Sequence, residues 1–142
     1  SSLAAMALAA APHAPEGKLL VPMLDARKGE VYAGVYRLEG GVPQPVLKDM
    51  VISTAALMQR LAPLGGTVGF GEGYEAYREL LAPQLPLLEG AGARSTPMAW
   101  AVANLVQSEL ATATYDPQTL FALEPHYIRP SEAEAKYPKG LQ

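Results

Sequence analysis

The stretch LLVPMLDARKGEVYAGVY, residues 19–36, decides the fold of this chain. Its first six residues form an almost unbroken apolar run, which is typical of a β-strand buried on both faces. The next five, DARKG, have turn chemistry, and Gly29 is free to adopt the positive φ that a hairpin bend often requires. The stretch therefore predicts one central strand that turns back into another.

The second strand of this hairpin, residues 30–37, has apolar bulk on both faces. Successive side chains of a strand point to opposite faces. One face therefore carries Val31, Ala33 and Val35, and the other carries Tyr32, Gly34 and Tyr36. We expect the hairpin to be the rigid centre of the domain, with Val31 and Val35 almost fully buried.

The opening SSLAAMALAAA, residues 1–11, predicts a packed helix rather than a signal peptide. It lacks a positively charged start, and Pro12 ends it after about three turns. Ser1 or Ser2 is a suitable cap. The expected buried stripe consists of Leu3, Met6, Ala7 and Ala10. Because this helix has almost no polar face, we expect it, or the adjacent end of the sheet, to join two copies of the chain in a symmetric dimer.

The remaining pattern is a third strand followed by alternating helices and strands. Pro43 and Pro45 remove hydrogen-bond donors, so the third strand, at 44–52, is expected at a sheet edge or to begin late. The further expected elements are a helix at 53–61, a strand at 67–70, a helix at 71–82, a short apolar strand at 85–88 and a helix from 97 to about 111. This order predicts an α/β domain with a mixed sheet.

Apolar stripes are expected on the two later helices. The helix at 71–82 is predicted to bury Tyr74, Tyr77, Leu80 and Leu81 on one side. The last helix, capped by Ser95 or Thr96 before Pro97, is predicted to bury Ala99, Val102, Ala103, Val106 and Leu110.

Composition places the chain among globular proteins. It has 142 residues, of which 49% are hydrophobic and 18% charged, and this length suits one domain with a generous core. The absence of cysteine excludes a disulfide scaffold and fits a reducing compartment. The net charge of −3 argues against unaided binding of nucleic acid, which needs a cationic face. No stretch reaches the roughly 20 apolar residues of a membrane span.

Two turns are candidate sites. Asp25, Arg27 and Glu30 at the hairpin tip are interpreted either as an acid–cation site or as a turn stabilised by its Asp side chain, and we favour the turn. Gly71-Glu72-Gly73 lies where a phosphate would meet a helix N-terminus. The motif is shorter than either phosphate-binding fingerprint, and Glu72 repels anions. We favour a tight turn and keep Gly71 and Gly73 as weak candidates for cofactor binding.

No catalytic or metal-binding set is recognisable. The two histidines, His13 and His126, lack a metal-ligand spacing. The G-x-S-x-G motif of hydrolases does not occur around any of the serines considered, which are Ser53, Ser95, Ser108 and Ser131. Glu132 and Glu134 are interpreted as part of a solvated terminus. Tyr127 and Arg129 are interpreted as a final packed segment, with a partner-binding edge as the alternative.

Four motifs resemble the bacterial TsaB family, also called YeaZ. They are DARKGEVYAGVY at 25–36, SSL at 1–3, GEG at 71–73, where the family has a GDG-type turn, and LEPHYIR at 123–129, which is similar to L-x-P-x-Y-L-R. They occur in the family's order. Nothing here resembles that family's N-terminal half, with its Asp-Thr-Ser strand end and its GPGSFTGLR stretch. The resemblance therefore implies one domain, residues 1–142, that corresponds to the C-terminal half.

The resemblance also implies a fold and a role. The fold is the RNase H-like half of the actin/hsp70/sugar-kinase (ASKHA) architecture. The role is that of a non-catalytic cytoplasmic scaffold in threonylcarbamoyladenosine modification of tRNA. Its expected partners, through the full-length protein, are a metal-carrying TsaD-like enzyme and a TsaE-like ATPase. The full-length complex is compatible with bound ATP or ADP, but this domain is not expected to bind a cofactor tightly. It is also not expected to bind tRNA directly by itself.

Two other functions remain as alternatives. The first is one lobe of an ATP-dependent small-molecule kinase or phosphotransferase of the same superfamily, with a nucleotide near residues 71–73. The second is the peptidase activity with which this wider family has been labelled, and the missing metal-ligand set disfavours it.

Overall fold

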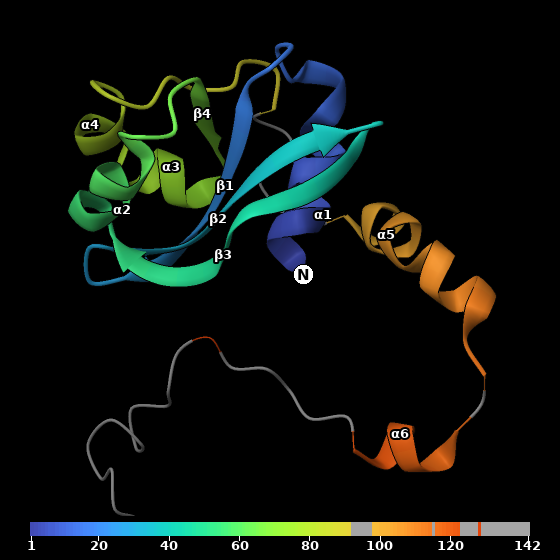
Figure 1. The fold of residues 1–142 in the computed structure, drawn as a ribbon. Coiled ribbons are helices and arrows are strands. Elements are labelled where there is room, and N and C mark those ends of the chain that lie inside the picture. Colours follow the sequence, from blue (N-terminus) through green and yellow to red (C-terminus); the bar gives the residue numbers. More distant parts are fainter. Residues whose placement is uncertain (92–97, 115, 123–127, 129–142) are drawn as a thin grey trace, which may run out of the picture.

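A four-stranded mixed sheet lies between two layers of helices in the computed structural model, which describes residues 1–91, 98–114, 116–122 and 128 (Figure 1). The strands are β1 (Leu19–Arg27), β2 (Glu30–Glu39), β3 (Val42–Ser53) and β4 (Thr67–Phe70). The helices are α1 (Ser2–Ala10), the 3₁₀ helix η1 (Ala11–His13), α2 (Thr54–Leu61), α3 (Glu72–Ala76), α4 (Arg78–Leu81), α5 (Ala99–Thr112) and α6 (Pro117–Phe121).

The sheet has the strand order β3-β2-β1-β4. The pairs β1–β2 and β2–β3 are antiparallel, and β4 runs parallel to β1. The prediction of an α/β fold with a mixed sheet is therefore confirmed. So is the edge position of the third strand, although β3 begins at Val42, before both of its prolines. A two-residue turn, Gly40-Gly41, joins β2 to β3, and both glycines have positive φ.

The two faces of the sheet carry separate hydrophobic clusters, because alternate residues of each strand point to opposite sides. Leu19, Val21 and Met23 of β1 face α2, α3 and α4, together with Val31 and Val35 of β2. Leu20 of β1 and Tyr36 of β2 face α1 instead. Val31 and Val35 have no exposed surface, which confirms the predicted centre of the domain.

Helix α1 begins with the predicted cap. The Ser1 hydroxyl accepts hydrogen bonds from the amides of Leu3 and Ala4 at 3.2 and 3.3 Å. Leu3 and Met6 are 3% and 0% exposed within one chain. The expectation that the apolar surface of α1 joins two copies was wrong for these two side chains, because the sheet already covers them. Dimerisation through another surface stays a prediction.

The predicted helix at 71–82 is interrupted. Tyr77 leaves helical geometry (φ −122°, ψ 26°) and separates α3 from α4. Tyr74 and Leu81 are buried as predicted, but Leu80 is 63% exposed, because the break turns it away from the sheet. The expected strand at 85–88 is only an isolated parallel bridge between Leu87 and Gly69 of β4.

Helix α5 lies against α1 on the side away from the sheet (Figure 1). It begins at Ala99, and the expected caps Ser95 and Thr96 lie outside the described residues. Its predicted buried stripe was wrong, because α5 packs on α1 through Ala101 and Leu105 instead. Among the described residues, no helix combines the length and the apolar character that crossing a membrane requires.

Candidate functional site

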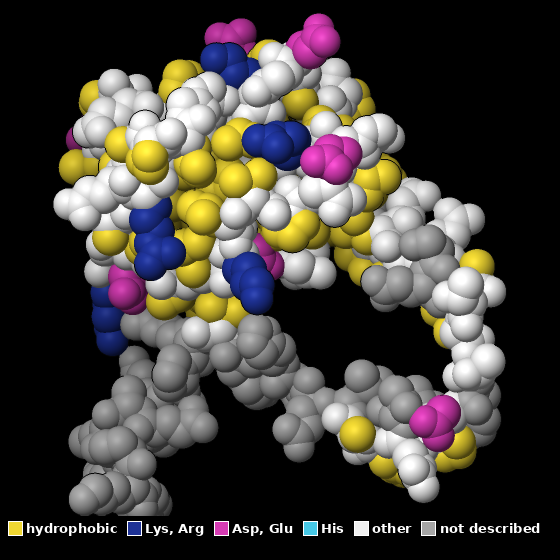
Figure 2. Space-filling view, in the orientation of Figure 1, with side chains coloured by type: hydrophobic (Ala, Val, Ile, Leu, Met, Phe, Trp, Pro, Cys, Tyr) yellow, Lys and Arg dark blue, Asp and Glu magenta, His cyan; other side chains and the backbone are white. Residues whose placement is uncertain are grey.

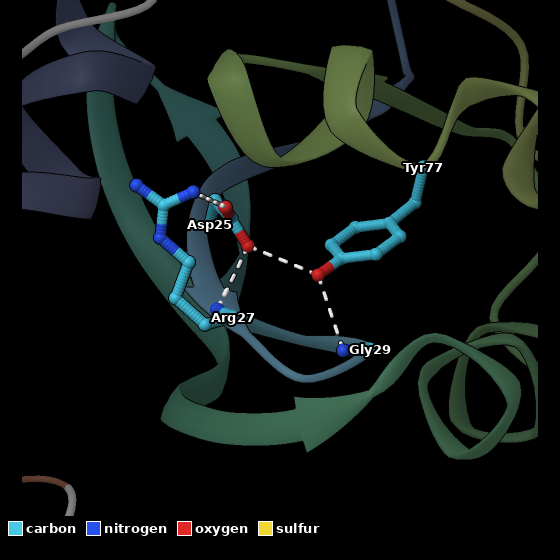
Figure 3. A network of polar contacts seen from close by, with 4 residues as sticks. All are labelled: Asp25, Arg27, Gly29 and Tyr77. Carbon is cyan, nitrogen blue, oxygen red and sulfur yellow. Dashed lines mark hydrogen bonds and ion pairs between the residues drawn. The ribbon is translucent and has the colours of Figure 1, made fainter.

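The hairpin tip is a connected polar network (Figure 3). Asp25 Oδ1 accepts hydrogen bonds from the Arg27 amide at 2.8 Å and from the Tyr77 hydroxyl at 3.0 Å. The Tyr77 hydroxyl in turn accepts one from the Gly29 amide at 3.2 Å. The other carboxylate oxygen of Asp25, Oδ2, lies 3.1 Å from Arg27 Nη1. One tyrosine between α3 and α4 thus holds both ends of the turn.

These contacts support the interpretation of the tip as a stabilised turn. Arg27 and Lys28 have φ of 65° and 55°, in the left-handed region that non-glycine residues rarely adopt. The carboxylate of Asp25 compensates part of this strain by accepting the Arg27 amide. That hydrogen bond, the bond from Tyr77 and the charge of Arg27 together lower the pKa of Asp25 below its ordinary value, against the opposing effect of burial. Asp25 therefore stays ionised and structural.

The sequence predicted the contact between Asp25 and Arg27 at the hairpin tip correctly, but it did not predict the contribution of Tyr77. Asp25 and Arg27 pair as expected, and Glu30 begins β2 opposite Arg27 and Ser53. Tyr77 was assigned to a buried helical stripe, yet its hydroxyl reaches a turn about fifty residues earlier. No local sequence pattern predicts this contact, because it depends on how α3 packs on β1.

Gly71 and Gly73 are explained by close packing. A Cβ at Gly71 would lie 2.3 Å from the Met23 carbonyl oxygen, and one at Gly73 would lie 2.8 Å from the Leu24 carbonyl carbon. Gly71 also has φ 103°. The two glycines thus let the start of α3 lie directly on the backbone of β1. Their role as cofactor-binding residues stays a prediction.

A cavity of about 230 Å³ adjoins Gly71. Phe70, Leu87 and Leu88 line its apolar part, and Glu75 and Glu89 contribute carboxylates. Two carboxylates repel a phosphate, and α3, with five residues, supplies only a short row of amides. The charge of this cavity therefore disfavours a nucleotide phosphate.

A second polar cluster connects the beginning of α1 with β2 and β3. The carboxylate of Asp49 accepts hydrogen bonds from the hydroxyls of Ser1 and Tyr36. Burial, reinforced by Asp49, raises the pKa of Tyr36. Gly34 makes room for this pair, because a Cβ there would lie 2.5 Å from Asp49 Oδ1. Sequence reasoning missed the cluster, since Asp49 lies in an edge strand without a motif.

An open cavity of about 490 Å³ adjoins this cluster, lined by Ser1, Ser2, Leu3, Leu24, Tyr32, Asp49 and Ile128. In the described part of the chain, no buried side-chain nitrogen or oxygen lacks a hydrogen-bond partner. The polar atoms of the cluster thus satisfy one another, and the arrangement joins three elements of the fold.

The remaining sequence candidates are dispersed. Ser53 caps α2, with its hydroxyl 3.3 Å from the Ala56 amide. His13 lies beside Gly90 at the far end of α1. No group of three His, Cys, Asp or Glu side chains capable of holding a metal ion occurs among the described residues.

Several further candidates lie outside the described residues. They are His126, Tyr127, Arg129, Ser131, Glu132 and Glu134. Ser108 belongs to α5, but the surroundings of its side chain are not described.

One comparison by sequence matches this chain to a curated protein. It is 28% identical over 122 residues to the tRNA threonylcarbamoyladenosine biosynthesis protein TsaB of Bacillus subtilis (strain 168). The match covers 84% of this chain and 51% of that protein, so the chain spans about half the length of this relative. No protein-family model matches the chain.

The fold has a solved counterpart in Pseudomonas aeruginosa. It is the crystal structure of an uncharacterized protein with similarity to peptidase YEAZ. The two structures agree with a TM-score of 0.65 and 26% sequence identity over 91% of this chain and 57% of the other. The predicted RNase H-like half of the ASKHA fold agrees with this match. The sequence and structural matches both agree with the resemblance of this chain to the TsaB (YeaZ) family.

Proposed function

We propose that this chain is the C-terminal half of a TsaB-like protein that takes part in threonylcarbamoyladenosine modification of tRNA. The observation that carries the proposal is the 122-residue match to the Bacillus subtilis TsaB. In this proposal the chain acts in the cytoplasm as a scaffold without catalytic residues of its own. A TsaD-like partner supplies the metal and transfers the threonylcarbamoyl group, and a TsaE-like ATPase joins the complex.

The polar contacts of the domain favour a scaffold over an enzyme. Asp25 and Asp49 are the carboxylates of its two polar networks, and each is engaged by hydroxyl groups that fix neighbouring elements. Tyr74, buried on α3, likewise donates its hydroxyl hydrogen to the Leu85 carbonyl oxygen at 2.8 Å. Groups engaged in this way hold the backbone in place, even where Asp49 also borders the open cavity beside α1.

A chimera tests the proposal. This chain replaces the matched half of the Bacillus subtilis TsaB, in cells depleted of their own TsaB. Mass spectrometry of nucleosides from total tRNA then measures threonylcarbamoyladenosine. We expect the chimera to restore the modification in the presence of the TsaD-like partner and to form none without it.

Two controls define the result. The unmatched half alone is expected to accumulate without restoring the nucleoside. A catalytically inactive TsaD-like partner combined with the chimera is expected to give none, as a scaffold requires. A chimera that accumulates and folds yet leaves the nucleoside at the depleted level would refute the proposal.

A further inference from the structure

Helix α1 covers only part of its face of the sheet. It has nine residues, and β1 has nine as well. A helix of this length is about 13 Å long, whereas a strand of this length extends about 30 Å. Leu20 and Tyr36, which pack with α1, are 0% and 3% exposed. Closer to the hairpin tip, Leu24 and Tyr32 of the same cluster are only partly buried. The hairpin end of this face therefore needs a second cover.

The uncovered part of this face is hollowed. Leu24 and Tyr32 lie directly opposite each other in the β1–β2 pair, so one apolar side chain can contact both. They belong to the lining of the open cavity of about 490 Å³ beside the polar cluster of Asp49. We call this cavity the hairpin-end hollow and define it by the residues of α1, β1, β2 and β3 that line it, which are Ser1, Ser2, Leu3, Leu24, Tyr32 and Asp49.

One residue from the other end of the chain completes the lining of the hollow. This residue is Ile128, about a hundred residues after the hairpin in the sequence, and it is half-buried. It belongs to the motif LEPHYIR, which the sequence left between a packed segment and a partner-binding edge. Burial of an isoleucine against Leu24 and Tyr32 is favourable, because it removes apolar surface from water.

The chemistry of the hollow suits an apolar occupant. Asp49 is its charged residue, and the carboxylate already accepts hydrogen bonds from the hydroxyls of Ser1 and Tyr36. An anion would be repelled by this carboxylate, whereas an aliphatic side chain has apolar partners in Leu24 and Tyr32.

We infer that the hairpin-end hollow is the binding site for the C-terminal end of the same chain, with Ile128 as its apolar anchor. An occupant on the same polypeptide also gains from its tether, which supplies an effective concentration on the order of 1 mM. The contact would complete the layer that α1 begins. It gives the LEPHYIR motif an intramolecular role, and it does not rest on the proposed function.

Hydroxyl-radical footprinting by mass spectrometry tests the inference on the 142-residue chain. Ile128→Asp brings a second carboxylate beside Asp49, and a charge cannot be buried there without a large cost. The segment should therefore leave the hollow, and the oxidation rates of Leu24 and Tyr32 should rise about twofold as water replaces their contact with the isoleucine. Val35 has no exposed surface on the other face of the sheet, so its unchanged rate shows that the domain stays folded.

Three further variants make the result specific. Phe121→Asp introduces the same charge at a nearby side chain that is 91% exposed, and it should leave both rates at the wild-type value. Ile128→Leu keeps an apolar side chain of the same volume and should preserve the protection. Ile128→Ala removes the anchor without adding a charge, and it should raise both rates even if Ile128→Asp does not fold.

Three results would overturn the inference. The first is equal oxidation of Leu24 and Tyr32 in the wild type and in Ile128→Ala. The second is a rise in Phe121→Asp as large as in Ile128→Asp, which would show a general effect of charge instead of a contact at Ile128. The third is protection in the wild type that grows with protein concentration, because the hollow would then be filled by a second copy.

Discussion

Three glycine substitutions separate the packing role of Gly71 from a role in binding a ligand. Gly71→Ala combines two penalties, the positive φ of 103° and a Cβ 2.3 Å from the Met23 carbonyl oxygen. Gly41→Ala has the positive φ of 83° but no atom within 4 Å. Gly73→Ala has the collision with β1 without positive φ. Gly41→Ala therefore measures the cost of backbone strain alone, and Gly73→Ala measures the cost of the steric collision with β1 alone. Gly71→Ala measures the two costs together.

The magnitudes follow from these contacts. Gly41→Ala should cost about 1–2 kcal/mol of unfolding free energy, the usual penalty for a left-handed alanine. The collision at Gly73 should cost about 1–3 kcal/mol, of which the better helix propensity of alanine returns about 1 kcal/mol. Gly71→Ala has both penalties and no compensation, so we expect a loss of about 2–5 kcal/mol. That is a large part of the total stability of a typical domain.

Thermal and urea unfolding of the isolated chain provide the assay. At this size, 1 kcal/mol corresponds to about 3–5 °C in melting temperature. Gly71→Ala should therefore melt several degrees below Gly41→Ala. If the two variants melted at the same temperature, the close approach to β1 would not be the reason for glycine at position 71, and the hypothesis of a ligand site there would gain support.

Four further expectations concern the core, the hairpin tip and possible ligands. Val35→Ala should cost about 1–3 kcal/mol in urea unfolding, and Lys28→Ala less than about 0.5 kcal/mol; equal stabilities would contradict the core assignment. The folded-state pKa of Asp25 is lowered, so its stabilising effect is complete above the ordinary value of 3.8 and is lost as pH falls below it. The melting-temperature difference between wild type and Asp25→Asn should accordingly shrink below that pH, and a difference independent of pH would refute the assignment. ATP with Mg²⁺ should leave the melting temperature of the isolated chain unchanged, and a shift that grows with ATP concentration would favour the kinase alternative. The isolated chain should not retain tRNA in filter binding at low salt, because its net charge is −3 and Lys and Arg lie scattered on the face in Figure 2; micromolar affinity that weakens steeply with salt would contradict this.

The hairpin and the sheet could be predicted from sequence because their signals are local. The apolar run that begins at Leu19, the alternation around Val35 and the glycine turn at 40–41 each lie within one element or its turn. The Ser53 cap of α2 is local in the same way, and the structure confirms it. Patterns of this kind fix the order of the elements and the inward faces of β1 and β2.

Contacts between distant segments could not be predicted. The hydroxyl of Tyr77 reaches Asp25, and Asp49 reaches Ser1, across about fifty residues in each case. The outward face of α5 was assigned wrongly for a related reason. Its periodicity shows two apolar stripes, and only the small residues of α1 decide that Ala101, rather than Val102, points inward.

The contact between α1 and α5 has a consequence for folding during synthesis. Ala5 and Ala9 are made before the residues that cover them, around Ala101, which follow nearly a hundred residues later. At about 5–20 residues per second, that delay is on the order of 5–20 s. Throughout this interval the hairpin and β4 can complete the sheet on the other side of α1, while its alanine face stays in water. The nascent domain therefore passes through a stage in which α1 is docked on the sheet while its other face is still exposed. Helix α5 then packs on that face and completes the burial of α1.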